Sequence, residues 1–367
     1  MPIHLHIGTH KTGTTAIQRQ LQRNREALKQ RGIWYPSEAE LLPGGSHGIP
    51  HRNIARSLNS TAAPKPYDRP SLRLMAQAIL RGARNYDHTI ISSEAFWRIG
   101  FPTQPEHCSP EKLWQRKLAN VASIRQLFAD GEVRVHAVLR ERSAYIQSSY
   151  SEFVLATLYK DDIYAYLRAY GHGWDYLQQL QAWSAHFPVT AHSYETLCTG
   201  NQLPLEFLRA LCGADLPDDI LAADPNPFAN VSDPLACISF KRFLNQQPIR
   251  LEKRDRLYRK YRRIFRQAAK RPRPSQTIQH LAALNSWLPT AELRSLQRDL
   301  AENDRAIRAA FCADLVSGPA KRFWPLPWQH DRRQPLSAAE HANVVGWMLA
   351  RQPLKPGWLL EPEADQR

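Results

Sequence analysis

The chain has 367 residues, 43% of them hydrophobic, and a formal net charge of +15. This ordinary globular composition suits one large α/β domain or a domain with an appended subdomain, and the lack of any run of 18 apolar residues excludes a membrane-spanning helix. The charge favours anionic partners, such as nucleotides, acidic glycans, lipid head groups or nucleic acid, without choosing among them.

Cysteine usage points to a reducing compartment. The five cysteines are scattered along the chain and form no Cys-x-x-Cys pair. An odd, dispersed set of this kind argues against a disulfide framework and fits reduced thiols in the cytosol. The start Met-Pro-Ile-His-Leu-His contains no basic region followed by a long apolar stretch, so we expect neither a signal peptide nor an anchor.

The most informative stretch is at the N-terminus. Ile3, Leu5 and Ile7 predict a short buried strand that ends at Gly8. A small-residue loop containing Lys11 follows, and a helix should begin at residue 14. Converging loop amides, the positive end of a helix dipole and a lysine together predict an anion-binding site.

The remaining elements alternate. Further strands are expected at residues 88–92, 133–139 and 189–193, and helices at residues 14–31, 53–58, 72–85, 113–130, 143–158, 162–170, 176–186 and 205–212. This alternation predicts an α/β fold, a central parallel sheet flanked by helices. Ligands of such sheets bind at the carboxyl ends of the strands, where Lys11, Glu94 and Arg140 are placed.

From about residue 225 the pattern is helical only. Residues 290–313 predict an amphipathic helix, and residues 318–367 are rich in Pro and Trp. We therefore expect an α/β core at residues 1–224 and an all-helical, basic C-terminal extension at residues 225–367, packed on the core.

The N-terminal loop differs from the nucleoside triphosphate loop, in which the lysine follows the second glycine. Here Lys11 precedes Gly13, and Lys-Thr-Gly-Thr-Thr resembles the 5′-phosphosulfate loop of sulfotransferases that use 3′-phosphoadenosine 5′-phosphosulfate (PAPS). The spacing from Arg140 to Ser148 resembles the 3′-phosphate motif of the same family, with Tyr150 also in place. Arg142 departs from it, because many carbohydrate sulfotransferases have proline there, and Ser149 is an alternative to Ser148.

A third segment carries the resemblance further. Residues 173–176 read Gly-Trp-Asp-Tyr and lead into the helix expected at residues 176–186, with Leu180, Trp183 and Phe187 on one face. Residues 192–197 read His-Ser-Tyr-Glu-Thr-Leu. This resembles the helix, strand and Tyr-Glu-x-Leu segment that follows the 3′-phosphate site in carbohydrate and bacterial sulfotransferases. We expect it to serve mainly in packing.

The resemblance covers residues 3–197 and implies a P-loop-type α/β fold with PAPS as cosubstrate and no metal. It implies in-line transfer of the sulfuryl group, with Lys11 neutralising the leaving phosphate. Arg140 and Ser148 would hold the 3′-phosphate. The loop residues implied to bind the donor are His10, Lys11, Thr12, Gly13, Thr14 and Thr15.

The general base is left open between four residues. Glu94 follows the second predicted strand, and carbohydrate sulfotransferases are similar in using a glutamate near this point, where a carboxylate takes the proton of the attacking hydroxyl. A glutamate at a helix N-terminus is also expected on electrostatic grounds alone. His10, His47 and His51 are the rivals, because relatives acting on phenols and steroids use a histidine.

Two other functions compete with a sulfotransferase. A P-loop kinase or ATPase conflicts with the position of the lysine and with the lack of an aspartate for Mg²⁺ at the ends of the second and third strands. A nucleic-acid-binding module conflicts with the lack of regular aromatic platforms in the basic segment, residues 241–273. We therefore expect no nucleic acid partner.

The acceptor is expected to be a carbohydrate or glycolipid, and the enzyme a bacterial, cytoplasmic one, peripheral to the inner membrane. Residues 241–273 contain 14 Lys or Arg against two acidic residues. A solvated helix face explains this as well as a landing surface for an anionic acceptor or membrane does. Helical spacing puts four arginines on one face and three aromatic residues on the other: Arg259, Arg262, Arg263, Arg266, Tyr258, Tyr261 and Phe265.

Overall fold

The computed structural model describes residues 1–61, 64–101, 109–198, 202–222, 232–312 and 334–355. The chain divides into two compact units that are interleaved along the sequence. The first contains residues 1–142, 170–227 and 300–326, and the second contains residues 143–169, 228–299 and 327–367. The single boundary expected at residues 224–225 lies outside the described residues.

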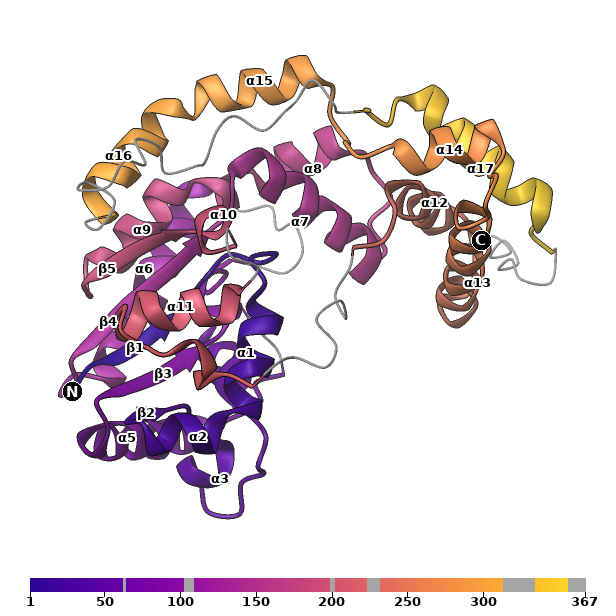
Figure 1. The fold of residues 1–367 in the computed structure, drawn as a ribbon. Coiled ribbons are helices and arrows are strands. Elements are labelled where there is room, and N and C mark those ends of the chain that lie inside the picture. Colours follow the sequence, from indigo (N-terminus) through magenta and orange to yellow (C-terminus); the bar gives the residue numbers. More distant parts are fainter. Residues whose placement is uncertain (62–63, 102–108, 199–201, 223–231, 313–333, 356–367) are drawn as a thin grey trace, which may run out of the picture. The chain divides into compact units, whose positions relative to one another are not determined.

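The first unit is built on a parallel sheet, as predicted (Figure 1). Within the described residues its strand order is β2-β3-β1-β4-β5. The strands are β1 (Ile3–His6), β2 (Ile33–Trp34), β3 (His88–Ser92), β4 (Val133–Leu139) and β5 (Val189–Ser193). The two-residue β2 was not predicted. Because β3, β1 and β4 are neighbours, the chain segments that leave their carboxyl ends emerge side by side.

Helices cover both faces of this sheet (Figure 1). On one face α1 and α11 pack against apolar side chains from β3 and β4, with Ile17, Ile90, Val138, Phe207 and Leu208 all fully buried. The helices of the unit are α1 (Thr14–Arg23), α2 (Arg25–Gln30), α3 (Glu38–Leu41), α4 (His51–Leu58), α5 (Arg69–Gly82), α6 (Pro110–Leu127), α9 (Tyr176–Ser184), α10 (Tyr194–Leu197), α11 (Leu203–Cys212) and α16 (Ala301–Phe311).

Two helices predicted as continuous are divided. The helix expected over residues 14–31 is interrupted at Asn24, whose side-chain amide donates to the carbonyl oxygen and the side-chain oxygen of Gln20, each at 2.9 Å. The helix expected over residues 290–313 becomes α15 (Thr290–Asp299) and α16, which belong to different units. At Asn24 the side chain bonds back to the preceding turn and so competes with the backbone hydrogen bonds that would continue the helix.

Arg142, the residue that departs from the family pattern, holds α16 within the first unit. Its side chain is buried, and Nη2 donates to Asn303 Oδ1 at 2.6 Å and to Asp304 Oδ1 at 2.5 Å. The guanidinium carbon lies 4.8 Å from the ring centre of Tyr176. A buried arginine needs such partners, so this position fixes a long-range contact.

A hydrogen-bonded carboxylate fixes the start of α3. Glu40 Oε2 accepts from the backbone N–H and the hydroxyl of Ser37 at 2.8 and 2.9 Å, and Oε1 accepts from Lys29 Nζ at 2.7 Å and Trp34 Nε1 at 3.1 Å. Burial raises the pKa of Glu40, but these hydrogen bonds outweigh it and lower that pKa to about 2. The ionised form therefore stabilises the fold.

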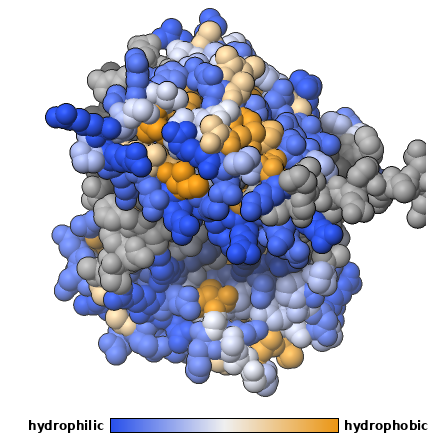
Figure 2. Space-filling model, turned by 90° about the vertical axis from the view of Figure 1, so that its right-hand side faces the viewer, coloured by the Kyte–Doolittle hydropathy of each residue, from blue (hydrophilic) through white to orange (hydrophobic). Residues whose placement is uncertain are grey.

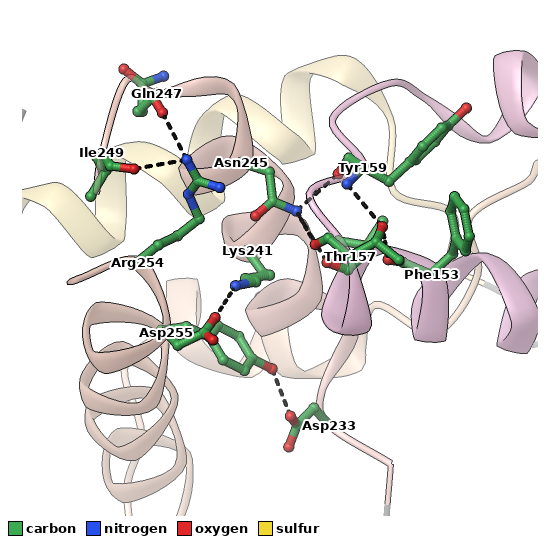
Figure 3. Close-up of polar contacts among 12 residues, drawn as sticks. Phe153, Thr157, Tyr159, Asp233, Lys241, Asn245, Gln247, Ile249, Arg254 and Asp255 are labelled. Carbon is green, nitrogen blue, oxygen red and sulfur yellow. Dashed lines mark hydrogen bonds and ion pairs between the residues drawn. The ribbon is translucent and has the colours of Figure 1, made fainter. Parts of the chain in front are cut away.

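The second unit is helical in its described residues. Its helices are α7 (Arg142–Ala156), α8 (Ile163–Tyr170), α12 (Leu235–Gln246), α13 (Leu251–Ala269), α14 (Gln276–Ala283), α15 and α17 (Ala338–Arg351), with the first residue of α7 and the last of α8 counted in the first unit. Buried Lys241 pairs with Asp255 at 2.5 Å, which ties α12 to α13 (Figure 3). Asn245 Nδ2 donates to backbone carbonyls of Val154 at 3.1 Å and Tyr159 at 2.9 Å, which ties α12 to the end of α7.

Among the described residues, no helix combines the length and apolar character that a bilayer crossing requires. The face seen in Figure 2 is mostly hydrophilic, and its apolar residues form separate small groups.

Candidate functional site

The N-terminal loop is locked by its own threonines. After β1 the chain stays beside β4, since the Thr9 N–H donates to the carbonyl of Val138 at 3.0 Å. Thr12 turns its hydroxyl inward and donates to the carbonyl of Thr9 at 2.6 Å. Lys11 and Gly13 both have positive φ, of 67° and 70°. This alternation of backbone conformations makes a tight concave turn of the kind that presents successive N–H groups to an anion.

The start of α1 leaves backbone donors for a ligand. Gly13 is the N-cap residue and offers no side-chain cap, and the first turn contains no acidic residue. Thr14 is buried, whereas Thr15 and Lys11 are exposed. A ten-residue helix whose first N–H groups have no capping side chain is a suitable anion site.

Arg140 lies beside this loop. It follows β4, and its Nη1 donates to the carbonyl of Lys11 at 3.2 Å. Its guanidinium carbon lies 5.5 Å from the ring centre of Tyr194. The Nε atom of Arg140 is buried and has no hydrogen-bond partner among the described residues. The structure thus brings Lys11 and Arg140 together and leaves a buried arginine donor unsatisfied.

The Tyr-Glu segment of α10 supports the strand end that carries Arg140. Glu195 Oε1 accepts from the Glu141 N–H at 3.0 Å, and the Tyr176 hydroxyl donates to the Arg140 carbonyl at 3.1 Å. Burial raises the pKa of Glu195. The expected packing role of Leu180, Trp183 and Phe187 agrees with their burial. The positioning role of Glu195 was missed, because nothing in the sequence signals a contact with residue 141.

Glu94 lies at the neighbouring strand end, after β3. Gln18 of α1 donates through Nε2 to the Ser92 carbonyl at 3.0 Å and to Glu94 Oε2 at 3.2 Å. The same helix that begins at the loop therefore orients this half-buried carboxylate. A carboxylate with one oxygen engaged and the other open is suited to accept a proton.

The three rival histidines lie in different environments. His51 is fully buried and its Nδ1 accepts from the Ser92 N–H at 3.1 Å, so it serves the fold. His47 is exposed, and its carbonyl accepts from Arg25 at 3.5 Å. The Nε2 atom of His10 is buried and has no hydrogen-bond partner among the described residues.

His10 also reveals two arginines that the sequence analysis missed. Burial first, then the charges of Arg98, Lys11 and Arg52, keep the pKa of His10 well below its usual value. Arg98 follows Glu94 by four residues, and Arg52 is the second residue of α4. Cationic side chains from three separate segments therefore act on His10, which favours an anionic ligand at this loop.

Ser148 and its alternative Ser149 lie on α7, in the second unit. Ser149 is buried and its hydroxyl bonds to that of Tyr166 at 2.9 Å, whereas Ser148 is half-buried. Tyr150 is buried and donates to the carbonyl of Asp161 at 2.8 Å. Of the two serines, Ser148 is the better placed for a ligand. Arg140 belongs to the first unit, so the pairing of Arg140 with Ser148 stays a prediction.

One group of described side chains has the donor set of a metal site, and it lies away from the loop. His4, His88 and Cys212 place their ligand atoms within 4.8 Å of one another. Two of these residues belong to the amino-terminal halves of β1 and β3, whereas Lys11, Glu94 and Arg140 follow the carboxyl ends.

Comparison with known proteins gives little. No model of a known protein family matches the chain, and no curated protein matches its sequence. A search of solved structures found a sulfotransferase from Alicyclobacillus acidocaldarius, with 15% identity over 62% of this chain and 88% of that chain and a TM-score of 0.35.

Proposed function

We propose that the protein transfers a sulfuryl group from PAPS to a hydroxyl of a carbohydrate or glycolipid acceptor. The observation that carries the proposal is the pairing of the Gly13-capped loop with Arg140, whose Nη1 lies 3.2 Å from the Lys11 carbonyl and whose buried Nε has no partner among the described residues. PAPS carries phosphates at both ends of its ribose, so a loop for one and an arginine for the other match its charge pattern.

In the proposed mechanism this chain supplies position and charge. The loop N–H groups and Lys11 bind the 5′-phosphosulfate and stabilise the negative charge that builds up on the leaving phosphate. Arg140 holds the 3′-phosphate together with Ser148, so binding at a distance from sulfur orients the donor. Glu94, held by Gln18, takes the proton of the acceptor hydroxyl as its oxygen attacks sulfur. The products are the sulfate ester and 3′-phosphoadenosine 5′-phosphate.

The residues of the loop have different roles in this proposal. The Thr12 hydroxyl is engaged at 2.6 Å inside the loop, so Thr12 contributes to the site through its backbone. Lys11 and Thr15 are exposed. In this proposal their side chains contact the 5′-phosphosulfate. His10 stays neutral in its positive surroundings and remains an alternative base to Glu94.

The proposed acceptor surface is α13 of the second unit. Through this helix a cytoplasmic enzyme would bind an anionic glycan or the surface of the inner membrane. As expected, Tyr258, Tyr261 and Phe265 are buried and hold this helix in the unit. Two of the four arginines are already paired, since Arg262 and Arg266 contact Asp233 at 3.1 and 2.7 Å.

The remaining charge of α13 is open to solvent. Arg254 is buried and donates to the carbonyl of Ile249 at 2.9 Å, so it does not contribute to a surface. Arg256, Arg259, Lys260 and Arg263 are exposed. They line a hollow of about 930 Å³ that also includes Lys253 and Lys270. A concentration of cations on one helix attracts anionic acceptors over several ångströms.

The donor assignment is tested by comparing 3′-phosphoadenosine 5′-phosphate with AMP in titration calorimetry without Mg²⁺. We expect the former to bind about 10- to 100-fold more tightly, because charge-assisted contacts to the 3′-phosphate contribute about 1.5–3 kcal/mol. Arg140→Ala should abolish this preference. Arg134→Ala is the matched control, since Arg134 is an exposed arginine of β4, the strand that precedes Arg140, and pairs with Glu132. Equal affinities of the native protein for the two nucleotides would remove the basis of the proposal.

A further inference from the structure

A row of histidines crosses the sheet of the first unit. Four neighbouring strands, β3, β1, β4 and β5, contribute one imidazole each. His88 Nδ1 lies 3.0 Å from His4 Nε2, His4 Nδ1 lies 3.0 Å from His136 Nε2, and His136 Nδ1 lies 3.1 Å from His192 Nε2. His4 and His136 are buried, so each must be satisfied by its neighbours.

One end of this row meets a thiol. Cys212 is the last residue of α11, which packs on the same face of the sheet through Phe207 and Leu208. Its Sγ, one ring nitrogen of His4 and one ring nitrogen of His88 all lie within 4.8 Å of one another. The three donors therefore come from three separate elements, β1, β3 and α11. These elements are far apart in the sequence, and the fold brings the donors together.

We infer that His4, His88 and Cys212 bind a zinc ion that cross-links β1, β3 and α11. Two imidazoles and a thiolate are a donor set that zinc prefers, and a solvent molecule completes the tetrahedron. Tetrahedral zinc with Zn–N bonds of about 2.0–2.1 Å holds its nitrogens about 3.3 Å apart. The observed separation of 3.0 Å between His4 Nε2 and His88 Nδ1 is within a few tenths of an ångström of that value.

The rest of the row supports the site as an outer shell. A zinc-bound His4 Nε2 requires the proton of that ring on Nδ1, which then donates to His136 Nε2. His136 in turn donates through Nδ1 to His192 Nε2. Such hydrogen bonds from the far nitrogen of a ligand fix its tautomer and ring orientation.

The site is independent of the proposed transfer reaction. The two ligating histidines lie in the amino-terminal halves of their strands, whereas the loop and Arg140 lie past the carboxyl ends. A shared element nevertheless connects the two regions, since α11 begins at Leu203, beside Gly13, and ends at Cys212. The ion therefore contributes to the stability of the helix that supports the loop.

The test uses the full-length protein without a histidine tag, stripped with a chelator and titrated with Co²⁺ and then Zn²⁺. We expect one Co²⁺ per chain, visible ligand-field bands of a tetrahedral site, near-ultraviolet thiolate-to-cobalt charge transfer, and displacement by Zn²⁺. Cys212→Ser should remove the charge-transfer absorption and weaken Zn²⁺ binding by at least about 100-fold, and Zn²⁺ should raise the melting temperature of the native protein but not of this variant.

Two further variants make the outcome decisive. Cys198→Ser is the matched control, because Cys198 is a free, half-buried cysteine of the same unit, and it should leave the cobalt spectrum unchanged. His88→Asn, at a half-buried position, should weaken Zn²⁺ binding even if Cys212→Ser does not fold. Failure of the native protein to take up one Co²⁺, or charge transfer that disappears with Cys198 and survives loss of Cys212, would overturn the assignment.

Discussion

Replacing Gly13 by alanine should destabilise the first unit by about 2–5 kcal/mol, from two separate causes. The φ of Gly13 is 70°, a left-handed conformation that costs an L-residue about 1–2 kcal/mol. An added Cβ would also lie 2.2 Å from Leu203 Cδ2, which forces α11 or its side chain to move. Overpacking of this kind typically costs about 1–3 kcal/mol.

Two further variants separate these causes in urea unfolding. Gly44→Ala is the matched control, because Gly44 has a φ of 72° and an added Cβ there would meet no atom within 4 Å, so it should cost only the backbone part. Combining Gly13→Ala with Leu203→Ala should recover the contact part and leave the backbone part, a non-additivity of about 1–3 kcal/mol. If Gly13→Ala cost no more than Gly44→Ala, α11 would not support the loop as described.

Three further outcomes follow from the same structure. Glu94→Gln should lower turnover about 100-fold or more in a sulfate-transfer assay while calorimetric nucleotide affinity stays unchanged, as expected for a general base; normal turnover would move that role to a histidine. Changing Arg256, Arg259 and Arg263 of α13 to Glu should raise the acceptor KM and flatten its salt dependence without changing donor affinity, and an unaltered KM in a folded variant would leave α13 a solvated face. Glu40→Gln should cost about 1–2 kcal/mol at pH 7, a value reduced for solvent screening. Because the pKa of Glu40 in the folded protein is about 2, the difference in stability between the two proteins should disappear as the pH falls from about 4.5 toward 2. If the difference in melting temperature stayed constant across that range, ionised Glu40 would not be the stabilising form.

The sequence was sufficient for the elements with strong local signals. The strands at residues 88–92, 133–139 and 189–193 were predicted with the bounds that the structure gives. β2 was missed because two residues are too few for a periodic pattern, and it is a strand only through its pairing with β3. The break at Asn24 depends on side-chain hydrogen bonds that helical periodicity does not reveal.

The candidate site was also predictable from the sequence only in part. The parallel sheet made it possible to predict that Lys11, Glu94 and Arg140 follow strand ends at one edge of the sheet, because that depends only on strand direction. That their strands are neighbours is a finding of the structure. Arg52 and Glu195 were missed, because they reach the region through tertiary contacts from elements far away in sequence. Residues that position a site from a distance carry no motif of their own.

The loop illustrates why a motif names more residues than a ligand contacts. Thr9 and Thr12 use their hydroxyls on carbonyls of the protein, at 3.3 and 2.6 Å, and these bonds hold the alternating backbone of the turn. The carbonyl of Lys11 accepts from Arg140 Nη1, and the side chain of Lys11 is exposed. Small polar residues in this loop therefore set the backbone, and the positive charge comes from Lys11 and from arginines of other chain segments, Arg52, Arg98 and Arg140. A positively charged anion site built in this way depends on the sheet for its assembly, which is why the stability of the loop and its affinity for a nucleotide should change together when Gly13 is replaced.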